Sequence, residues 1–118
     1  MQDKLLISSR IKKTIEYVKK STDNYPHEYI WLKNKIIDSY DILLRLSYRS
    51  NLFKKTDDMK EMLVEIKMIE YYIKISYSYK LISIKKFENI GKYMLEINKM
   101  INSWVTNETS RQSVQQDS

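Results

Sequence analysis

The stretch that decides the fold is residues 80–105, which read KLISIKKFENIGKYMLEINKMINSWV. Large apolar residues recur there at steps of 3, 4, 3, 4 and 3, namely at Phe87, Ile90, Met94, Ile97, Ile101 and Trp104. This spacing places all of them along one side of a single helix. Ser83 is a favourable N-cap, and Ile82 and Phe87 occupy the two positions of a hydrophobic staple. We therefore expect a helix that starts at Ser83 and runs for about six turns.

Three further segments have apolar residues at helical spacing. The first is expected at residues 3–20, the second at residues 27–50, and the third from about Thr56 to Tyr79. Asp58, followed by Glu61, resembles a capping box for the third. The expected core residues of these segments are Ile7, Ile11, Ile15, Val18, Leu32, Ile36, Tyr40, Leu43, Met59, Met62, Ile66, Ile69, Ile73 and Ser76.

The chain of 118 residues has one Gly and one Pro, which leaves little material for the tight turns of a sheet. Four helices joined by short connections predict an all-α fold, an antiparallel up-down-up-down four-helix bundle. We expect the bundle domain to span residues 1–106. Residues 107–118 are rich in Ser, Gln and Thr, and we expect a disordered polar tail there.

Several kinds of chemistry have no residues to carry them. The chain has no Cys and one His, whereas a di-metal centre in a bundle needs Glu-x-x-His pairs on facing helices. One glycine also excludes a Gly-rich phosphate loop. We expect no catalytic residue, no cofactor, no metal and no small-molecule substrate. No apolar run is long enough for a membrane span, so we expect a cytoplasmic protein without membrane contact.

Positive charge is concentrated along the chain, whose net charge is +6. In an antiparallel bundle the first and third connections share one end, which should gather lysines of residues 19–20 and 80–86 there. The basic run at residues 45–55 should lie at the other end. Such clusters can serve solubility alone, or they can contact phosphates. The candidate nucleic-acid contacts are Lys12, Lys13, Lys19, Lys20, Arg45, Arg49, Lys74, Lys80, Lys85 and Lys86.

Charges elsewhere on the helices suggest local pairing. Glu88 with Lys92, and Glu70 with Lys74, stand in the favourable i,i+4 order. We therefore interpret most of the outer face of the fourth helix as a solvated, internally paired surface.

The third helix carries a second apolar stripe about 100° from its core face. Its members are Met68, Tyr72, Ile75 and Tyr79. Two interpretations stay open: the stripe is a broad edge of the bundle core, or it is an interface with another subunit, where Tyr and Met are favoured.

The sequence also resembles a known family. The run Lys80-Leu81-Ile82-Ser83, followed by Phe87-Glu88, Glu96-Ile97, Lys99-Met100-Ile101 and Trp104-Val105, is similar to the C-terminal helix of the accessory variability determinant (Avd) proteins of diversity-generating retroelements. Their relatives include four-helix-bundle proteins encoded by ribosomal RNA intervening sequences. Upstream, Tyr25-Pro26-His27-Glu28 is similar to the start of the family's second helix.

This resemblance implies an antiparallel four-helix subunit that assembles into a homopentameric barrel with basic surfaces. It also implies a non-catalytic role beside a reverse transcriptase and its template RNA in mutagenic cDNA synthesis. The expected partners are thus RNA or DNA, a reverse transcriptase and further copies of the chain. The alternative is a small helical protein-interaction module of the ribosomal intervening-sequence type, without nucleic-acid binding.

Overall fold

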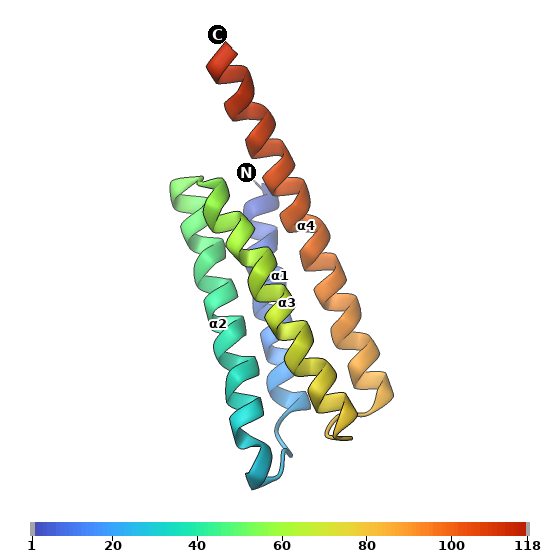
Figure 1. Ribbon diagram of the computed structural model, residues 1–118. Helices are drawn as coiled ribbons and strands as arrows, with labels where there is room; N and C mark the ends of the chain where they lie inside the picture. Colours follow the sequence, from blue (N-terminus) through green and yellow to red (C-terminus); the bar gives the residue numbers. More distant parts are fainter. Residues whose placement is uncertain (1, 118) are drawn as a thin grey trace.

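Helices account for nearly all of the chain (Figure 1). The computed structural model describes the backbone of residues 2–117 and the side chains of residues 7–112. The elements are α1 (Gln2–Ser21), a short 3-10 helix η1 (His27–Tyr29), α2 (Ile30–Phe53), α3 (Thr56–Ser78) and α4 (Ile84–Asp117). The predicted all-α fold of four helices is therefore confirmed for the described residues.

The helices run alternately up and down, and each packs against the next (Figure 1). α4 also packs against α1, which closes the ring, while α1 and α3 lie on one diagonal and α2 and α4 on the other. Arg10 of α1 lies opposite Glu96 of α4, and Tyr17 opposite Asn89, so these two helices are antiparallel. The α1–α2 and α3–α4 connections lie at one end and the α2–α3 connection lies at the other.

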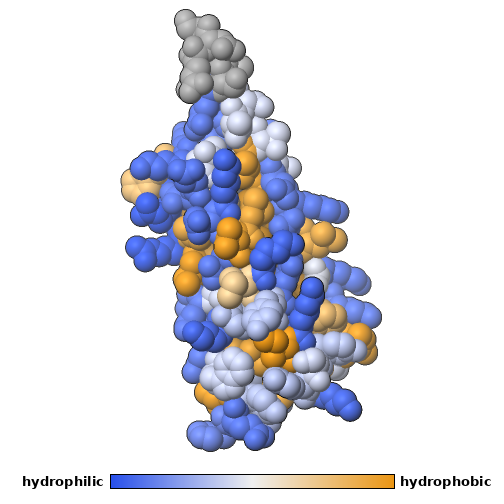
Figure 2. Space-filling model, in the orientation of Figure 1, coloured by the Kyte–Doolittle hydropathy of each residue, from blue (hydrophilic) through white to orange (hydrophobic). Residues whose placement is uncertain are grey.

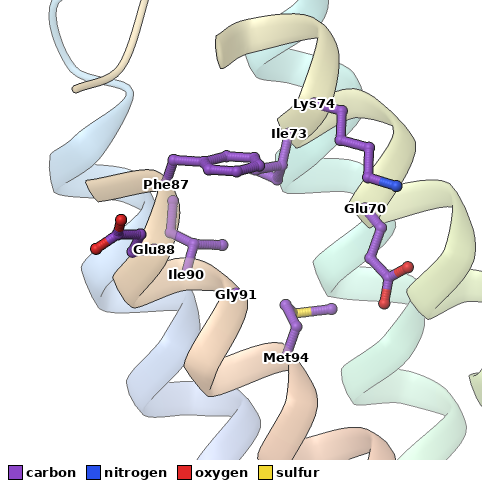
Figure 3. A pocket seen from close by; sticks show the side chains of 8 residues that line it. All are labelled: Glu70, Ile73, Lys74, Phe87, Glu88, Ile90, Gly91 and Met94. Carbon is purple, nitrogen blue, oxygen red and sulfur yellow. The ribbon is translucent and has the colours of Figure 1, made fainter. Parts of the chain in front are cut away.

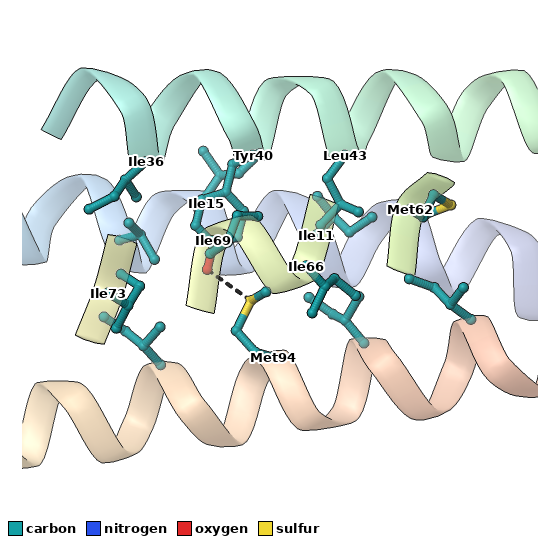
Figure 4. Packing of buried hydrophobic residues seen from close by; sticks show 14 of the residues in the cluster. Ile11, Ile15, Ile36, Tyr40, Leu43, Met62, Ile66, Ile69, Ile73 and Met94 are labelled. Carbon is teal, nitrogen blue, oxygen red and sulfur yellow. Dashed lines mark hydrogen bonds between the residues drawn. The ribbon is translucent and has the colours of Figure 1, made fainter. Parts of the chain in front are cut away.

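The core follows the predicted spacing closely (Figure 4). Every core residue expected from α1, α2 and α3 is buried, as are Ile90, Met94, Ile97, Ile101 and Trp104 of α4. Phe87 is half-buried, because it lies near the surface and stacks on Tyr77 with 4.5 Å between ring centroids. The helical period alone therefore selects the buried face of each helix.

Polar contacts between buried side chains link different helices across the interior. The hydroxyls of Ser8 in α1 and Ser47 in α2 lie 2.9 Å apart. The hydroxyl of Tyr40 donates to Sδ of Met94 over 2.9 Å (Figure 4). Burial raises the pKa of Tyr40 far above its ordinary value, so this side chain stays protonated in the folded protein.

Lysines stand at the C-terminal ends of α2 and α3, where helices commonly have glycine. Lys54 has φ 56° and Lys80 has φ 60°, both in the left-handed region. The N–H of Lys54 donates to the carbonyl of Ser50 over 2.9 Å, and that of Leu81 donates to the carbonyl of Ser76 over 2.9 Å. These bonds satisfy the last carbonyls of each helix in spite of the side-chain crowding.

The helix starts agree only in part with the sequence analysis. Ser83 is an N-cap as predicted, since its Oγ accepts from the N–H of Lys86 over 3.1 Å. The predicted capping box at Asp58 is wrong, because α3 already starts at Thr56 after Lys55, which makes no side-chain cap bond. The connector is also shorter than expected, because α2 continues to Phe53.

α4 continues to Asp117, where the sequence analysis expected disorder from residue 107 onward. Neither Gly nor Pro follows Gly91, so nothing in this stretch terminates the helix. Glu108 lies one turn beyond Trp104 on the same side and is buried, and its Oε1 accepts from Nη2 of Arg111 over 2.6 Å. The last turns of α4 extend past the ends of the other helices (Figure 1). Ser118 lies outside the described residues, and the division of the chain at residue 106 stays a prediction.

Candidate nucleic-acid interface

The antiparallel topology brings one set of lysines to the end of the molecule that holds the α1–α2 and α3–α4 connections (Figure 1). We call this set the lysine pole; its members are Lys19, Lys20, Lys80, Lys85 and Lys86. All of them are exposed, and no ion pair between described side chains involves any of them. Their ammonium groups are therefore available to an anionic ligand.

The opposite end carries the second basic group. Lys54 and Lys55 are exposed beside the apolar side chains of Leu52 and Phe53, and these residues form what we call the α2–α3 corner. Arg45 is also exposed, one helical turn before Arg49. This end therefore combines free cations with unburied apolar surface.

Arg49 differs from the other cations of this end because its guanidinium contacts other side chains of the same chain. Its Nε lies 3.5 Å from Oδ1 of Asp58, and its guanidinium carbon lies 5.5 Å from the centroid of the Phe53 ring. The carboxylate of Asp58 offsets much of the positive charge. Arg49 is therefore a positioning residue for this corner rather than a free phosphate contact.

The remaining candidate contacts lie on the sides of the bundle and join neither end. Lys12 places its Nζ 5.4 Å from the centroid of the Tyr48 ring, a cation–π contact between α1 and α2. Lys13 is exposed on α1. Lys74 lies on the edge of a groove between α3 and α4, on the same side as Glu70, whereas Glu88 lies on the opposite side of the groove and points away (Figure 3). The acidic side chain of Glu70 makes Lys74 the least favourable of the predicted phosphate contacts.

The predicted pairing along single helices is not what the structure shows. Among the described side chains, Glu70 pairs with Lys67 at 3.6 Å rather than with Lys74. Glu96 pairs with Arg10 of α1 at 3.0 Å, and no ion pair joins Glu88 to Lys92. Glu96 therefore takes a partner from another helix, which spacing along one helix does not reveal, whereas Glu70 pairs within α3 with the lysine three residues before it.

The groove between α3 and α4 was not predicted from the sequence (Figure 3). Ile73, Phe87, Ile90 and Met94 line its floor, and its volume is about 240 Å³. It forms at Gly91, where an added Cβ would meet nothing within 4 Å. This volume lies below the range of about 300–1,000 Å³ that is usual for small-molecule sites. The groove therefore adds no support for a small-molecule ligand.

The four residues of the second apolar stripe of α3 fall into two groups, and each group fits one of the two interpretations. Tyr72 and Ile75 are half-buried and pack against the core. Met68 is 39% exposed and Tyr79 is 52% exposed, although the Tyr79 ring lies 5.2 Å from that of Tyr29. Two members thus belong to the core edge, and two remain largely in solvent.

Further exposed apolar residues enlarge this surface, which sequence analysis missed. On α2, Trp31, Ile42 and Phe53 follow one another at intervals of eleven residues, which brings them close to one line along the helix. Arg49, on the same side of α2, reaches Asp58 of α3, so this line faces α3. Val64 and Tyr71 of α3 are exposed as well. In Figure 2, hydrophobic surface is interspersed among hydrophilic side chains on the face turned to the viewer.

Metal-ligating clusters and membrane-spanning helices are both absent from the described part of the chain. No group of three or more His, Asp or Glu side chains there is arranged to hold a metal ion. No helix among those residues combines the length and the apolar character needed to span a bilayer.

Comparison with known proteins bears directly on these features. The chain matches the family model described as bAvd-like over residues 5–108. That range contains most of α1, all of α2 and α3, and the part of α4 that packs on them. The chain belongs to the bAvd-like family. No curated protein matches it.

Membership confirms the resemblance to Avd proteins inferred from the C-terminal helix. As a bAvd-like protein, the chain carries the lysine pole and the α2–α3 corner within the matched range. The projecting end of α4 after residue 108 lies outside that range. The features that distinguish the two ends of the bundle therefore belong to the family part of the chain.

Proposed function

We propose that the protein is a non-catalytic accessory protein of a diversity-generating retroelement. In this role it binds template RNA or cDNA and the reverse transcriptase through its basic surfaces and supports mutagenic reverse transcription. The observation that carries the proposal is the lysine pole of a bAvd-like bundle, where five exposed lysines form no ion pair with any side chain that the structure describes.

The mechanism is electrostatic. Lysines that neutralise phosphates release condensed counterions, and this provides affinity without reading the base sequence. The lysine pole consists of lysine side chains alone. It contains no arginine, the side chain that most often recognises a base through two hydrogen bonds to its edge. We therefore expect contact with the nucleic-acid backbone, with affinity that depends steeply on salt.

Self-association would increase this effect. We propose that the exposed apolar surface of α2 and α3, which includes Met68 and Tyr79 and borders the half-buried Tyr72 and Ile75, packs against another copy in a homo-oligomer, a pentamer as in the family's barrel. Several poles on one assembly would bind one polyanion with higher avidity than a single subunit.

A titration of labelled structured RNA at several salt concentrations tests the proposal. We expect log affinity to fall with log salt at a slope steeper than about −3, since each neutralised phosphate contributes about −0.7 to −0.9. Charge reversal of Lys19, Lys20, Lys85 and Lys86 to Glu should weaken binding at least about 100-fold with helicity unchanged. The matched control reverses Lys35, Lys67, Lys92 and Lys99, which changes net charge equally and leaves the lysine pole and the α2–α3 corner unaltered.

Absence of RNA binding by the unaltered protein at low salt would contradict the proposal. Equal losses in the two reversed variants would leave net charge, and not the lysine pole, as the cause of binding.

The second candidate function is a helical protein-interaction module. The exposed apolar surface of α2 and α3 favours it, because such surface on a soluble helix pair is typical of protein contact. This module would self-associate or bind a protein partner and leave RNA unbound under every salt condition of the same titration.

A further inference from the structure

The α2–α3 corner carries two apolar side chains that do not contribute to the hydrophobic core. Leu52 is 73% exposed and Phe53 is 57% exposed, the largest exposed fractions among the large apolar side chains that the structure describes. Both follow the last buried residue of α2, Ser50, and neither belongs to the core. An aromatic ring exposed to solvent at the end of a helix is available for contact with a ligand.

The Phe53 ring is held in place by its neighbours. The guanidinium of Arg49 lies over the ring, and Asp58 fixes that guanidinium through an ion pair. Asp58 is itself well placed for this task, since its side chain is only 16% exposed and lies in the first turn of α3. The chain therefore orients an exposed aromatic ring before any ligand arrives, which lowers the entropic cost of stacking on it.

The backbone of the corner keeps a lysine where glycine would fit better. Lys54 has φ 56°, a conformation in which its Cβ crowds the backbone. The left-handed turn presents Lys54 and Lys55 directly after the ring, and both ammonium groups are exposed. An aromatic ring next to two free cations is the combination that unpaired nucleic acid requires, a stacking surface for the base and positive charge for the phosphates.

We propose that the α2–α3 corner binds an unpaired stretch of RNA or DNA. Phe53 stacks on a base, Lys54 and Lys55 contact the adjoining phosphates, and Arg49 with Asp58 positions the ring. The inference rests on the proposed function and deepens it. It assigns unpaired RNA or DNA to the α2–α3 corner, whereas the lysine pole contacts the phosphate backbone of single strands and duplexes alike. Bases in a duplex are stacked on each other and cannot reach the ring, whereas bases in loops and single strands can.

Charges around the corner favour a strand over an anionic bilayer. Asp57 and Glu61 are exposed in the first two turns of α3, and a flat anionic surface would meet them together with the lysines. A single strand is narrow enough to follow Lys54 and Lys55 and avoid both carboxylates. The apolar part of the corner is also limited to two side chains, which is little surface for insertion into a membrane.

The test compares Phe53→Ala with unaltered full-length protein on two fluorescent probes: an oligouridylate of about 20 nucleotides and an RNA duplex of similar length. We expect the substitution to weaken binding to the single strand about 10-fold or more and to leave duplex affinity within about 2-fold. Phe53→Trp should retain single-strand affinity, since it keeps a stacking ring. Leu95→Ala is the matched control, because Leu95 is a similarly exposed apolar side chain that lies on α4, outside the α2–α3 corner.

A salt series separates the ring from the lysines. Phe53→Ala should leave the salt slope unchanged, whereas Lys54→Gly should make it shallower by about 0.7 because one phosphate contact is lost. Lys54→Gly also relieves the backbone crowding, so its effect cannot come from unfolding, and circular dichroism of every variant checks this.

Unchanged single-strand affinity in Phe53→Ala overturns the inference while the proposed function stands, provided that the unaltered protein binds both probes. Equal weakening on strand and duplex overturns it too. If the unaltered protein binds neither probe at low salt, the proposed function and this inference fail together. Flotation of the protein with phosphatidylserine-containing vesicles, lost in both Leu52→Ala and Phe53→Ala, would assign the corner to a membrane and overturn the inference as well.

Discussion

The hydroxyl of Tyr40 donates a hydrogen bond to Sδ of Met94 over 2.9 Å, and this bond connects α2 with α4 across a diagonal of the bundle (Figure 4). The two helices are not neighbours around the ring, so few other contacts fix their relative height. Both side chains are buried, and a buried hydroxyl without a partner costs about 1–3 kcal/mol. The pair therefore favours one vertical register of these helices.

We expect Tyr40→Phe to lower the free energy of unfolding by about 1 kcal/mol through loss of this bond. Met94→Leu should cost more, about 1–3 kcal/mol, since it leaves the Tyr40 hydroxyl buried without a partner. The double variant should be less destabilised than the sum of the two. Urea unfolding of all four proteins checks this, and strict additivity would show that the two side chains do not interact.

Tyr40 should also make the fold sensitive to alkali. Burial raises its pKa above the ordinary 10.0, so the folded chain retains a proton that the unfolded chain releases. The contribution to stability is thus complete below pH 10 and is lost as pH rises above it. We expect the free energy of unfolding to fall by about 1.4 kcal/mol more per pH unit above that point in the unaltered protein than in Tyr40→Phe.

Thermal unfolding of both proteins across this pH range measures the difference directly. Burial also raises the pKa of Tyr25, which is present in both, so only Tyr40 distinguishes the two curves. Parallel curves would contradict the prediction.

Lys54→Gly and Lys80→Gly should each stabilise the protein by about 0.5–1 kcal/mol. Glycine removes the Cβ crowding at positive φ, and this gain exceeds its extra freedom in the unfolded chain. Lys54→Ala is the control, because it removes the same long side chain but keeps a Cβ and should bring no gain. An equal rise in melting temperature for glycine and alanine would instead attribute the effect to charge.

Ser110→Pro tests the projecting part of α4. Proline in a helix interior costs about 3 kcal/mol or more, but here it should end the helix locally and leave the bundle intact. We expect reduced helical ellipticity with a melting temperature changed by less than about 2 °C. Lys92→Pro, an exposed position of α4 inside the bundle, should lower the melting temperature sharply. Strong destabilisation by Ser110→Pro would mean that the last turns support the core.

Met68→Glu should weaken self-association. We expect the unaltered protein to have a solution mass several times its 14.3 kDa chain mass, and the variant to shift toward a single chain, because a carboxylate in an apolar interface is unfavourable. Leu95→Glu makes the same change on an exposed site of α4 and should leave the mass unaltered. Sedimentation equilibrium gives both masses, and a single chain at the highest concentration of unaltered protein would contradict the expectation.

The core could be predicted from the sequence because burial in a bundle depends on the helical period and on little else. Ile66, Ile69 and Ile73 lie where their spacing places them. Helix ends were less predictable, because competing caps lie close together in the chain. Thr56, Asp57 and Asp58 are all competent, and packing against Arg49 determines what Asp58 does.

The candidate site was predictable only at the level of topology. Antiparallel helices require Lys19, near the end of α1, and Lys85, at the start of α4, to share an end, and the hydrogen bond between Tyr17 and Asn89 shows that these two segments lie together. Whether a cation is free depends on its neighbours from other helices, as with Arg49 beside Asp58, and no spacing along one helix contains that information. The helical end of α4 was missed for a related reason: its polar composition suggested disorder, while the burial of Glu108 depends on packing.

The molecule, including the projecting end of α4, extends about 57 Å along its long axis and 22 Å across it, and the two ends of the bundle differ in chemistry. Because its two ends differ, the subunit has a defined direction along its long axis. Copies related by rotation about an axis parallel to the helices would all point the same way, so their lysine poles would form one rim and their α2–α3 corners the other. Copies related by a perpendicular twofold axis would mix the two at each rim. The symmetry of the assembly therefore decides whether a passing strand meets the lysines and the aromatic rings on opposite sides or together.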